Sequence, residues 1–90
     1  MDIEELVSSR IRKARRIREL SQQEAADLVG ISQHAWATYE LGTRKVSLRM
    51  LQIISDKLDF PIEFFVSPKY DIKVEEVEIK KAAARRHRAA

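Results

Sequence analysis

The sequence contains no cysteine and only two glycines and two prolines in 90 residues. Without cysteine the chain can form neither disulfide bonds nor thiolate metal sites, and it has no cysteine nucleophile. Aromatic residues make up 7% of the chain. Together with the scarcity of glycine and proline, this argues against a sandwich of short strands joined by tight turns. No apolar run is long enough to cross a membrane, and no signal-peptide pattern opens the chain. We expect a small, mainly helical, cytoplasmic protein.

The positive charge of the chain is concentrated near its C-terminus. Residues 1–66 carry ten basic and ten acidic residues, whereas residues 67–90 carry seven basic and four acidic ones, so the net charge of +3 lies in the second part. A basic segment favours an anionic partner. We interpret residues 1–66 as a folded domain and residues 67–90 as a basic tail. Tyr70, Ile72 and Val74 alternate as in a strand, but the residues after them are good helix formers, so the structure of this tail stays open.

Capping residues and apolar periodicity predict five helices and an all-α fold. Asp2 and Ser21 are each followed three residues later by Glu, which is the spacing of a capping box, and Ser32 and Ser47 are further N-cap candidates. Two glycines are placed to end helices in a left-handed conformation. The predicted helices are residues 3–18, a segment between Ser21 and Gly30, residues 33–40 ending before Gly42, a segment from Ser47 to Leu58, and residues 62–66 with Pro61 at the first position.

The segment with most functional content is residues 20–47. A short capped helix, a turn containing glycine and a second capped helix describe a helix-turn-helix at about residues 22–40. Such a pair can hold its second helix where it enters the major groove of DNA. The spacing alone fits an ordinary helical hairpin equally well.

The residue pattern resembles the Cro/repressor-like helix-turn-helix family, also called the xenobiotic response element family of bacterial and phage regulators. The resemblance covers roughly residues 7–66 and implies a five-helix, lambda-repressor-like domain that binds operator DNA, usually as a two-fold dimer. The matching residues follow one another at the family's spacings: Ile11, Arg15, Leu20, Ser21, Gln22, Glu24, Ala26, Val29, Gly30, Ile31, Ser32, Trp36, Tyr39, Glu40, Gly42, Ser47, Leu48, Leu51, Ile54 and Leu58.

Four residues depart from that family's usual pattern. Ala14 and Ala25 stand where larger aliphatic residues are usual, so Trp36 is expected to fill the space. Glu19 replaces a common glycine, and Leu28 occupies a position that is normally polar.

The resemblance also assigns DNA contacts residue by residue. Gln22 begins the second helix, where free N–H groups and the helix dipole attract a phosphate. Gln33 is the best candidate for base readout, because a glutamine amide can bind N6 and N7 of adenine. The predicted base-reading residues are Gln33, His34, Ala37 and Thr38, and the predicted phosphate-binding residues are Gln22, Thr43, Arg44 and Lys45.

Other residues of the pattern are predicted to be structural. Arg15 and Glu40 occupy positions where the family often has a partly buried ion pair between the first and third helices. Trp36 and Tyr39 are interpreted as core residues rather than base-stacking ones, and the remaining arginines of the first helix as a solvated face. Apolar residues off the predicted core positions of the last two helices are dimer-interface candidates: Met50, Ile53 and Phe64.

We therefore predict a sequence-specific DNA-binding transcriptional regulator, a repressor that binds an inverted-repeat operator as a homodimer. The sequence has only two histidines, His34 and His87, with no acidic pair at ligand spacing, so no metal or other cofactor is expected. It has no glycine-rich phosphate loop, and an enzyme is not expected. Two alternatives stay open: an antitoxin whose residues 67–90 bind a toxin, and an adaptor whose helix-turn-helix fold contacts protein only.

Overall fold

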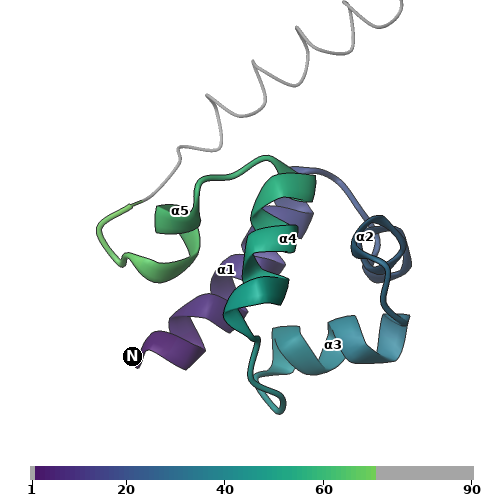
Figure 1. Cartoon of the computed structure of the whole chain (residues 1–90), viewed down its shortest axis with the longest axis horizontal. Coiled ribbons are helices and arrows are strands. Elements are labelled where there is room, and N and C mark those ends of the chain that lie inside the picture. The colour runs from purple at the N-terminus through teal and green to yellow at the C-terminus, as the bar shows by residue number, and fades with distance from the viewer. Residues whose placement is uncertain (1, 71–90) are drawn as a thin grey trace, which may run out of the picture.

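The computed structural model describes residues 2–70, which contain five helices and no strand. Figure 1 shows α1 (Ile3–Ile17), α2 (Gln22–Val29), α3 (Gln33–Leu41), α4 (Leu48–Leu58) and α5 (Ile62–Val66). The predicted all-α fold is confirmed, with α1 one residue shorter and α3 one residue longer than expected. The predictions for Ile72, Val74 and the basic end of the tail lie outside the described residues.

The helices begin and end at the residues that the sequence marks. The side chains of Asp2, Ser21, Ser32 and Ser47 each accept a hydrogen bond from the backbone N–H three residues later, at 2.8–3.1 Å. The Glu24 carboxylate in turn accepts a hydrogen bond from the backbone N–H of Ser21, which completes a capping box.

The fifth helix has the predicted bounds, residues 62–66, but the role of Pro61 differs from the predicted one. Pro61 is the N-cap of α5 in extended backbone, with ψ at 154°, rather than its first helical residue. The φ that the proline ring fixes suits either position. At the N-cap, the carbonyl of Pro61 accepts a hydrogen bond from the backbone N–H of Phe64 at 3.0 Å.

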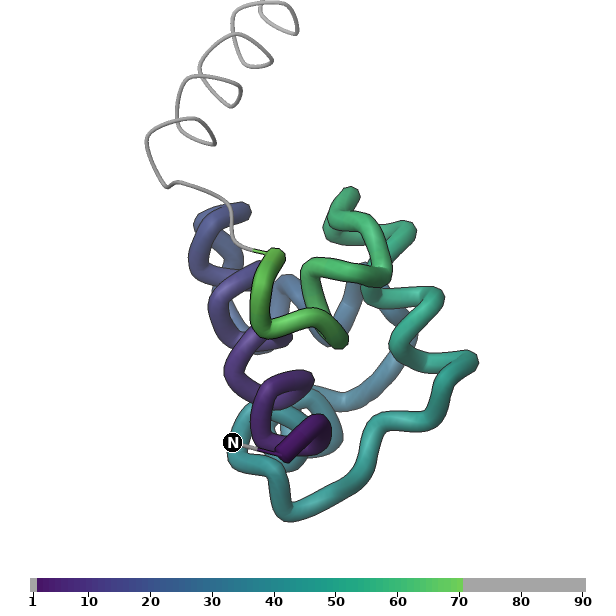
Figure 2. Tube along the Cα trace, turned by 90° about the vertical axis from the view of Figure 1, so that its left-hand side faces the viewer, coloured from purple at the N-terminus to yellow at the C-terminus, as the bar shows by residue number. Residues whose placement is uncertain are grey.

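Helices α1 and α4 each pack against three of the other helices. Helix α1 contacts α3, α4 and α5, while α2 packs against α3 and α4. Figure 2 shows the same arrangement from the side, with α1 and α5 next to each other. The fully buried Ala14, Ala25 and Ala26 belong to the same core cluster as the fully buried Trp36. The core thus contains small side chains from α1 and α2 together with the large indole of α3.

The aromatic residues around α5 close one end of the core. Phe64 stacks on Phe60, with ring centroids 4.5 Å apart, and meets Phe65 edge-on at 5.1 Å. Phe64 is 0% exposed, so its prediction as a dimer contact is wrong: its ring is used within the protomer. Tyr70 lies edge-on to Phe64, with ring centroids 6.3 Å apart.

Arg10 in α1 and Arg18, its C-cap, bind backbone carbonyls instead of forming a solvated face. Arg18 donates to the carbonyls of Leu58 and Asp59, both at 2.7 Å, and its guanidinium lies 4.2 Å from the ring centroid of Phe60. Arg10 donates to the carbonyls of Phe64, at 3.0 Å, and Tyr70. Both arginines therefore satisfy carbonyls near the ends of α4 and α5 that have no intrahelical partner. Burial lowers the pKa of Arg18, and the nearby charge of Asp59 opposes that shift.

The residue after the C-cap of α1, Glu19, has a left-handed backbone although it is not glycine. Glu19 has φ of 58°. Its N–H donates to the carbonyl of Arg16 at 3.0 Å, and the N–H of Leu20 donates to that of Arg15 at 3.1 Å. These two bonds form a Schellman motif, in which glycine is preferred at the left-handed position. The glycine usual in the family thus has a conformational reason at this position.

We expect Glu19→Gly to raise the free energy of unfolding by about 1 kcal/mol, because glycine adopts positive φ without the Cβ strain. The measurement is urea denaturation at neutral pH. The matched control is Arg16→Gly, an exposed position inside the same helix, where the free energy should fall by about 1 kcal/mol. A lower denaturation midpoint for Glu19→Gly would contradict the prediction.

Candidate nucleic-acid interface

Helices α2 and α3 and the turn between them form a helix-turn-helix. Gly30 closes α2 with φ of 75°, Ile31 donates its N–H to the carbonyl of Ala26 at 3.0 Å, and Ser32 caps α3. In Figure 1, α2 is seen nearly end-on, while α3 runs across the lower edge of the molecule. Trp36 and Tyr39 are the buried residues of α3, so both are core residues, as predicted. The exposed residues of α3 are Gln33, His34 and Leu41.

The predicted base-reading residues lie together on α3. Gln33 and His34 are exposed in its first turn, and Ala37 and Thr38 are half-buried one turn later. Positions four apart in a helix lie on the same side, so these two pairs form one continuous face. The Thr38 hydroxyl donates to the carbonyl of Ala35 at 2.6 Å. Its hydrogen is therefore engaged, while its oxygen can still accept.

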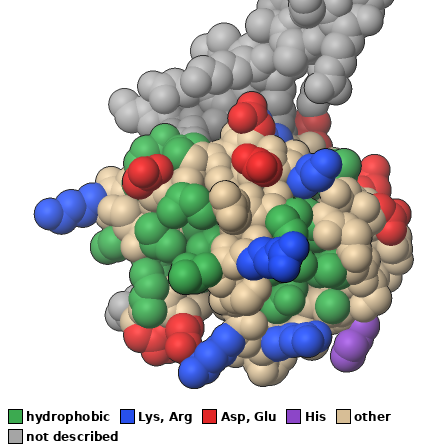
Figure 3. All heavy atoms as spheres, viewed as in Figure 1, with side chains coloured by type: hydrophobic (Ala, Val, Ile, Leu, Met, Phe, Trp, Pro, Cys, Tyr) green, Lys and Arg blue, Asp and Glu red, His purple; other side chains and the backbone are tan. Residues whose placement is uncertain are grey.

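The predicted phosphate-binding residues lie on both sides of that face. Gln22 is the first residue of α2, and Thr43, Arg44 and Lys45 are exposed in the connection from α3 to α4. The backbone N–H of Thr43 donates to the carbonyl of Thr38 at 3.1 Å, which holds the start of this connection against α3. Figure 3 shows Lys and Arg side chains along the lower edge of the molecule, where this connection runs. The cationic groups near this helix face thus lie in the connection after α3, whereas Gln22 at the start of α2 is neutral.

The ion pair predicted between Arg15 and Glu40 is present. Arg15 Nε lies 2.5 Å from Glu40 Oε2, and Arg15 Nη2 lies 3.1 Å from Glu40 Oε1, so the contact is bidentate. The side chains are 14% and 5% exposed, respectively. The third donor nitrogen, Nη1, binds the carbonyl of Leu20 at 2.9 Å. This one arginine therefore joins α1 to α3 and to the segment that leads into α2.

The Glu40 carboxylate accepts hydrogen bonds from two further side chains, which could not be inferred from the sequence. Trp36 Nε1 donates to Oε2, and Gln22 Nε2 donates to Oε1 at 3.3 Å. Burial by itself raises the pKa of Glu40, but the hydrogen bonds from Arg15, Trp36 and Gln22 and the charge of Arg15 outweigh burial and hold the pKa below its ordinary value. The stability that Glu40 contributes is therefore present near neutral pH and is lost as the pH falls through this lowered pKa.

The position of Gln22 follows from this network. A carboxylate can only accept hydrogen bonds, so Glu40 fixes Nε2 of Gln22 toward itself. Nε2 carries a second hydrogen, which the contact with Glu40 does not use. The predicted phosphate ligand at the start of α2 is thus oriented by a buried group of α3. Helix α2 begins at Gln22, so backbone N–H groups without intrahelical partners lie beside the same side chain.

The described residues contain neither a candidate metal site nor a candidate membrane span. In residues 2–70, no group of three His, Asp or Glu side chains could hold a metal ion. No helix within that range is long and apolar enough to cross a membrane.

Comparison with known proteins identifies the family. A family model described as helix-turn-helix matches residues 11–65. The match includes α2, α3 and α4, the second half of α1 and all of α5 except its last residue. The chain therefore belongs to the Cro/repressor-like helix-turn-helix family of transcriptional regulators.

Curated relatives and a solved structure agree with this assignment. The chain is 34% identical over 76 residues to an uncharacterized HTH-type transcriptional regulator, YqaE, of Bacillus subtilis. It is 39% identical over 59 residues to an uncharacterized HTH-type transcriptional regulator of Sinorhizobium medicae. The matches cover 84% and 66% of this chain but only 66% and 42% of those relatives. The crystal structure of the clp gene regulator ClgR from C. glutamicum shares the fold, with a TM-score of 0.63, 19% identity and coverage of 93% and 94%.

We expect Arg15→Met to lower the free energy of unfolding by about 3–5 kcal/mol, because it leaves the buried Glu40 carboxylate without its counter-charge. The control is Lys45→Met, which breaks the exposed pair between Lys45 Nζ and Glu4 Oε1 at 3.4 Å and should cost at most about 1 kcal/mol. A double-mutant cycle of Arg15→Met with Glu40→Gln measures the coupling. A coupling energy near zero would show that the two side chains do not stabilise each other.

Proposed function

We propose that this protein is a sequence-specific DNA-binding repressor of transcription that binds an inverted-repeat operator as a homodimer. The observation that carries this proposal is the exposed face of α3, on which Gln33 and His34 lie one turn before Ala37 and Thr38. This face is flanked by Gln22 on one side and by Arg44 and Lys45 on the other. A helix of this kind fits the major groove, and its neighbours reach the phosphates.

Base recognition is assigned to the front of α3. Gln33 is exposed in the first turn and can donate to N7 and accept from N6 of one adenine. Ala37 is small enough to let a base approach, and its methyl group can meet that of thymine. Because these side chains carry no formal charge when His34 is neutral, selectivity comes from hydrogen-bond pattern and shape rather than from attraction.

Phosphate contacts set the position of α3 in the groove. Gln22 presents its amide at the start of α2, and the exposed Arg44 and Lys45 follow α3. Such contacts fix the register on the duplex without selecting sequence. Occupation of an operator in this way covers one face of the DNA and excludes other proteins from it, which is why repression is the regulatory effect we propose.

The dimer interface is assigned to α4 and α5. Met50 and Ile53 are half-buried on α4, and Ile62, which is 38% exposed, replaces the buried Phe64 as the apolar residue that α5 offers to a partner. A two-fold pair would place two copies of α3 in successive major grooves about 34 Å apart.

We expect Gln33→Ala to weaken binding to the preferred operator by about 1–3 kcal/mol for each contacted base pair and to relax the preference at that position. Arg44→Ala should instead weaken binding to all sequences together and lower the slope of log affinity against log salt by about 0.9. Selection of binding sites from random duplexes, followed by titrations at several salt concentrations, measures both effects. Neither residue belongs to the core, so the melting temperature should stay unchanged. An unaltered preferred site for Gln33→Ala, or no enriched sequence for the wild type, would favour the protein-binding adaptor instead.

We expect Ile53→Asp and Ile62→Asp to yield monomers in sedimentation, because each places a charge in the proposed apolar interface. The matched control is Leu28→Asp, which charges a residue of α2 that is 45% exposed, and it should leave the mass unchanged. Thermal melting separates dissociation from unfolding for Ile53, which also packs against the core. A wild-type protein that sediments as a monomer at high concentration would overturn the proposed dimer.

A further inference from the structure

An apolar groove of about 220 Å³ lies between the start of α1, the start of α4 and the end of α5. Its lining includes Ile3, Val46, Leu48 and Val66. Leu48 and Ile3 are 85% and 54% exposed, and Leu41, which precedes the groove residue Gly42, is 75% exposed. These are the three most exposed large apolar side chains among residues 2–70. In Figure 3, apolar side chains gather on the left of the molecule.

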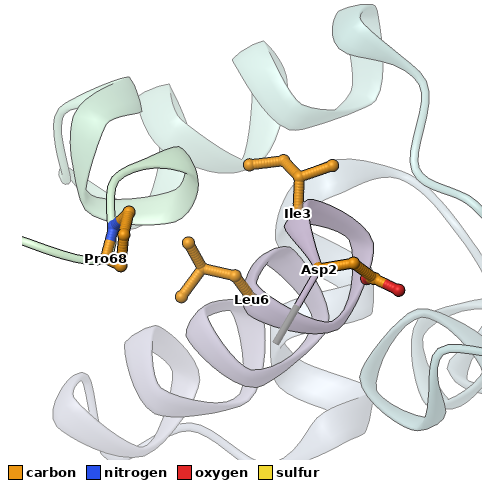
Figure 4. Close-up of a pocket in the computed structure, with 4 residues that line it drawn as sticks. All are labelled: Asp2, Ile3, Leu6 and Pro68. Atoms are coloured by element: carbon orange, nitrogen blue, oxygen red, sulfur yellow. The ribbon is translucent and has the colours of Figure 1, made fainter.

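The groove adjoins the place where the described chain ends. Ile3 also lines a small pocket of about 150 Å³ with Leu6 and Pro68. Figure 4 shows these three side chains around that pocket, with the Asp2 carboxylate directed away from Pro68. Arg10, which binds the carbonyls of Phe64 and Tyr70, lies seven residues after Ile3, about 10 Å along the helix. The chain therefore leaves the folded part within about two helical turns of the groove.

The rim of the groove and the following sequence have complementary charge. Arg44 and Lys45 line the rim and are exposed; Glu4 also lines it, in a solvent-exposed pair with Lys45. Such a pair contributes little, so Lys45 can exchange partners at small cost. Residues 71–79 contain four acidic residues and one lysine, and Val74 and Val77 stand on either side of Glu75 and Glu76 in the sequence. Residues 80–90 contain five basic residues and no acidic one. The tail thus has an acidic, apolar part followed by a basic part.

We propose that residues 74–79 dock into this groove of their own chain. Val74 and Val77 would contact Ile3 and Leu48, and the intervening glutamates would face Arg44 and Lys45. The seven residues from Tyr70 to Val77 can span about 23 Å. This distance exceeds the length of α1 between Ile3 and Arg10. A tethered segment also has an effective concentration near the millimolar range, which favours the same chain over a second copy.

Docking would make Arg44 and Lys45 unavailable to DNA phosphates. This consequence rests on the proposed function, whereas the docking itself does not. The acidic part of the tail would then lower DNA affinity in a sequence-independent way, and the basic part would raise it. Binding of DNA and docking of residues 74–79 compete for the same two side chains.

Engineered cysteines test the docking directly, because the natural chain contains none. We expect full-length Leu48→Cys/Val77→Cys, and the same partner with Val74→Cys, to form an intramolecular disulfide under mild oxidation. Mass spectrometry and non-reducing electrophoresis measure it. The control pairs Leu28→Cys, an exposed apolar site on α2 outside the groove, with Val77→Cys and should stay reduced. Equal oxidation of the control, no disulfide in either test pair, or a covalent dimer would overturn docking within one chain.

DNA affinity then tests the competition. Val74→Ser/Val77→Ser in the full chain changes no charge and should tighten binding to a random duplex about tenfold if the segment is docked in about 90% of molecules. Leu48→Ser, on the groove side, should act in the same direction. If the disulfide forms but these variants bind DNA as the wild type does, docking stands and the competition is overturned. If no variant binds any duplex, the proposed function fails, while the disulfide result still decides the docking.

Discussion

The buried carboxylate of Glu40 determines how the first three helices are arranged. One oxygen accepts from Arg15 and Trp36, and the other accepts from Arg15 and Gln22. Three helices therefore meet at one group that can only accept hydrogen bonds. Any rotation of α2 or α3 relative to α1 would leave a buried donor or the carboxylate itself without a partner, which is costly in a low-dielectric interior. Glu40 thus fixes the orientation of α3 without reaching its exposed face.

Three of the arginines on or directly after α1 make structural contacts, so the positive charge that crowds this part of the chain is not all available to an anionic partner. Arg10, Arg15 and Arg18 bind carbonyls or a carboxylate of other elements, and their planar guanidinium groups suit several acceptors at once. These cations hold the ends of α4 and α5 and the buried Glu40. In the proposed function, contact with DNA phosphates is assigned to the exposed Arg44 and Lys45 in the connection after α3.

Local signals made most of the fold predictable from the sequence. Caps at Ser21, Ser32 and Ser47 depend on side chains three residues from their partners, and the face of α3 depends on helical periodicity, so both could be inferred. Contacts between distant segments could not. Phe64 lies in a helix of five residues, which is too short for periodicity to show its buried side. The bonds of Arg10 and Arg18 span 40 or more residues, and no spacing in the sequence signals them. The contact of Gln22 with Glu40 was missed for the same reason.

Structural and exposed positions are interleaved along α3. Trp36, Tyr39 and Glu40 face inward, while Gln33 and His34 face solvent and make no contribution to the core. Mutations on the exposed side can therefore accumulate without a loss of stability. Under the proposed function, a lineage of such proteins can change the DNA sequence that it prefers by drift at a few outer positions, and the inward residues keep each intermediate folded.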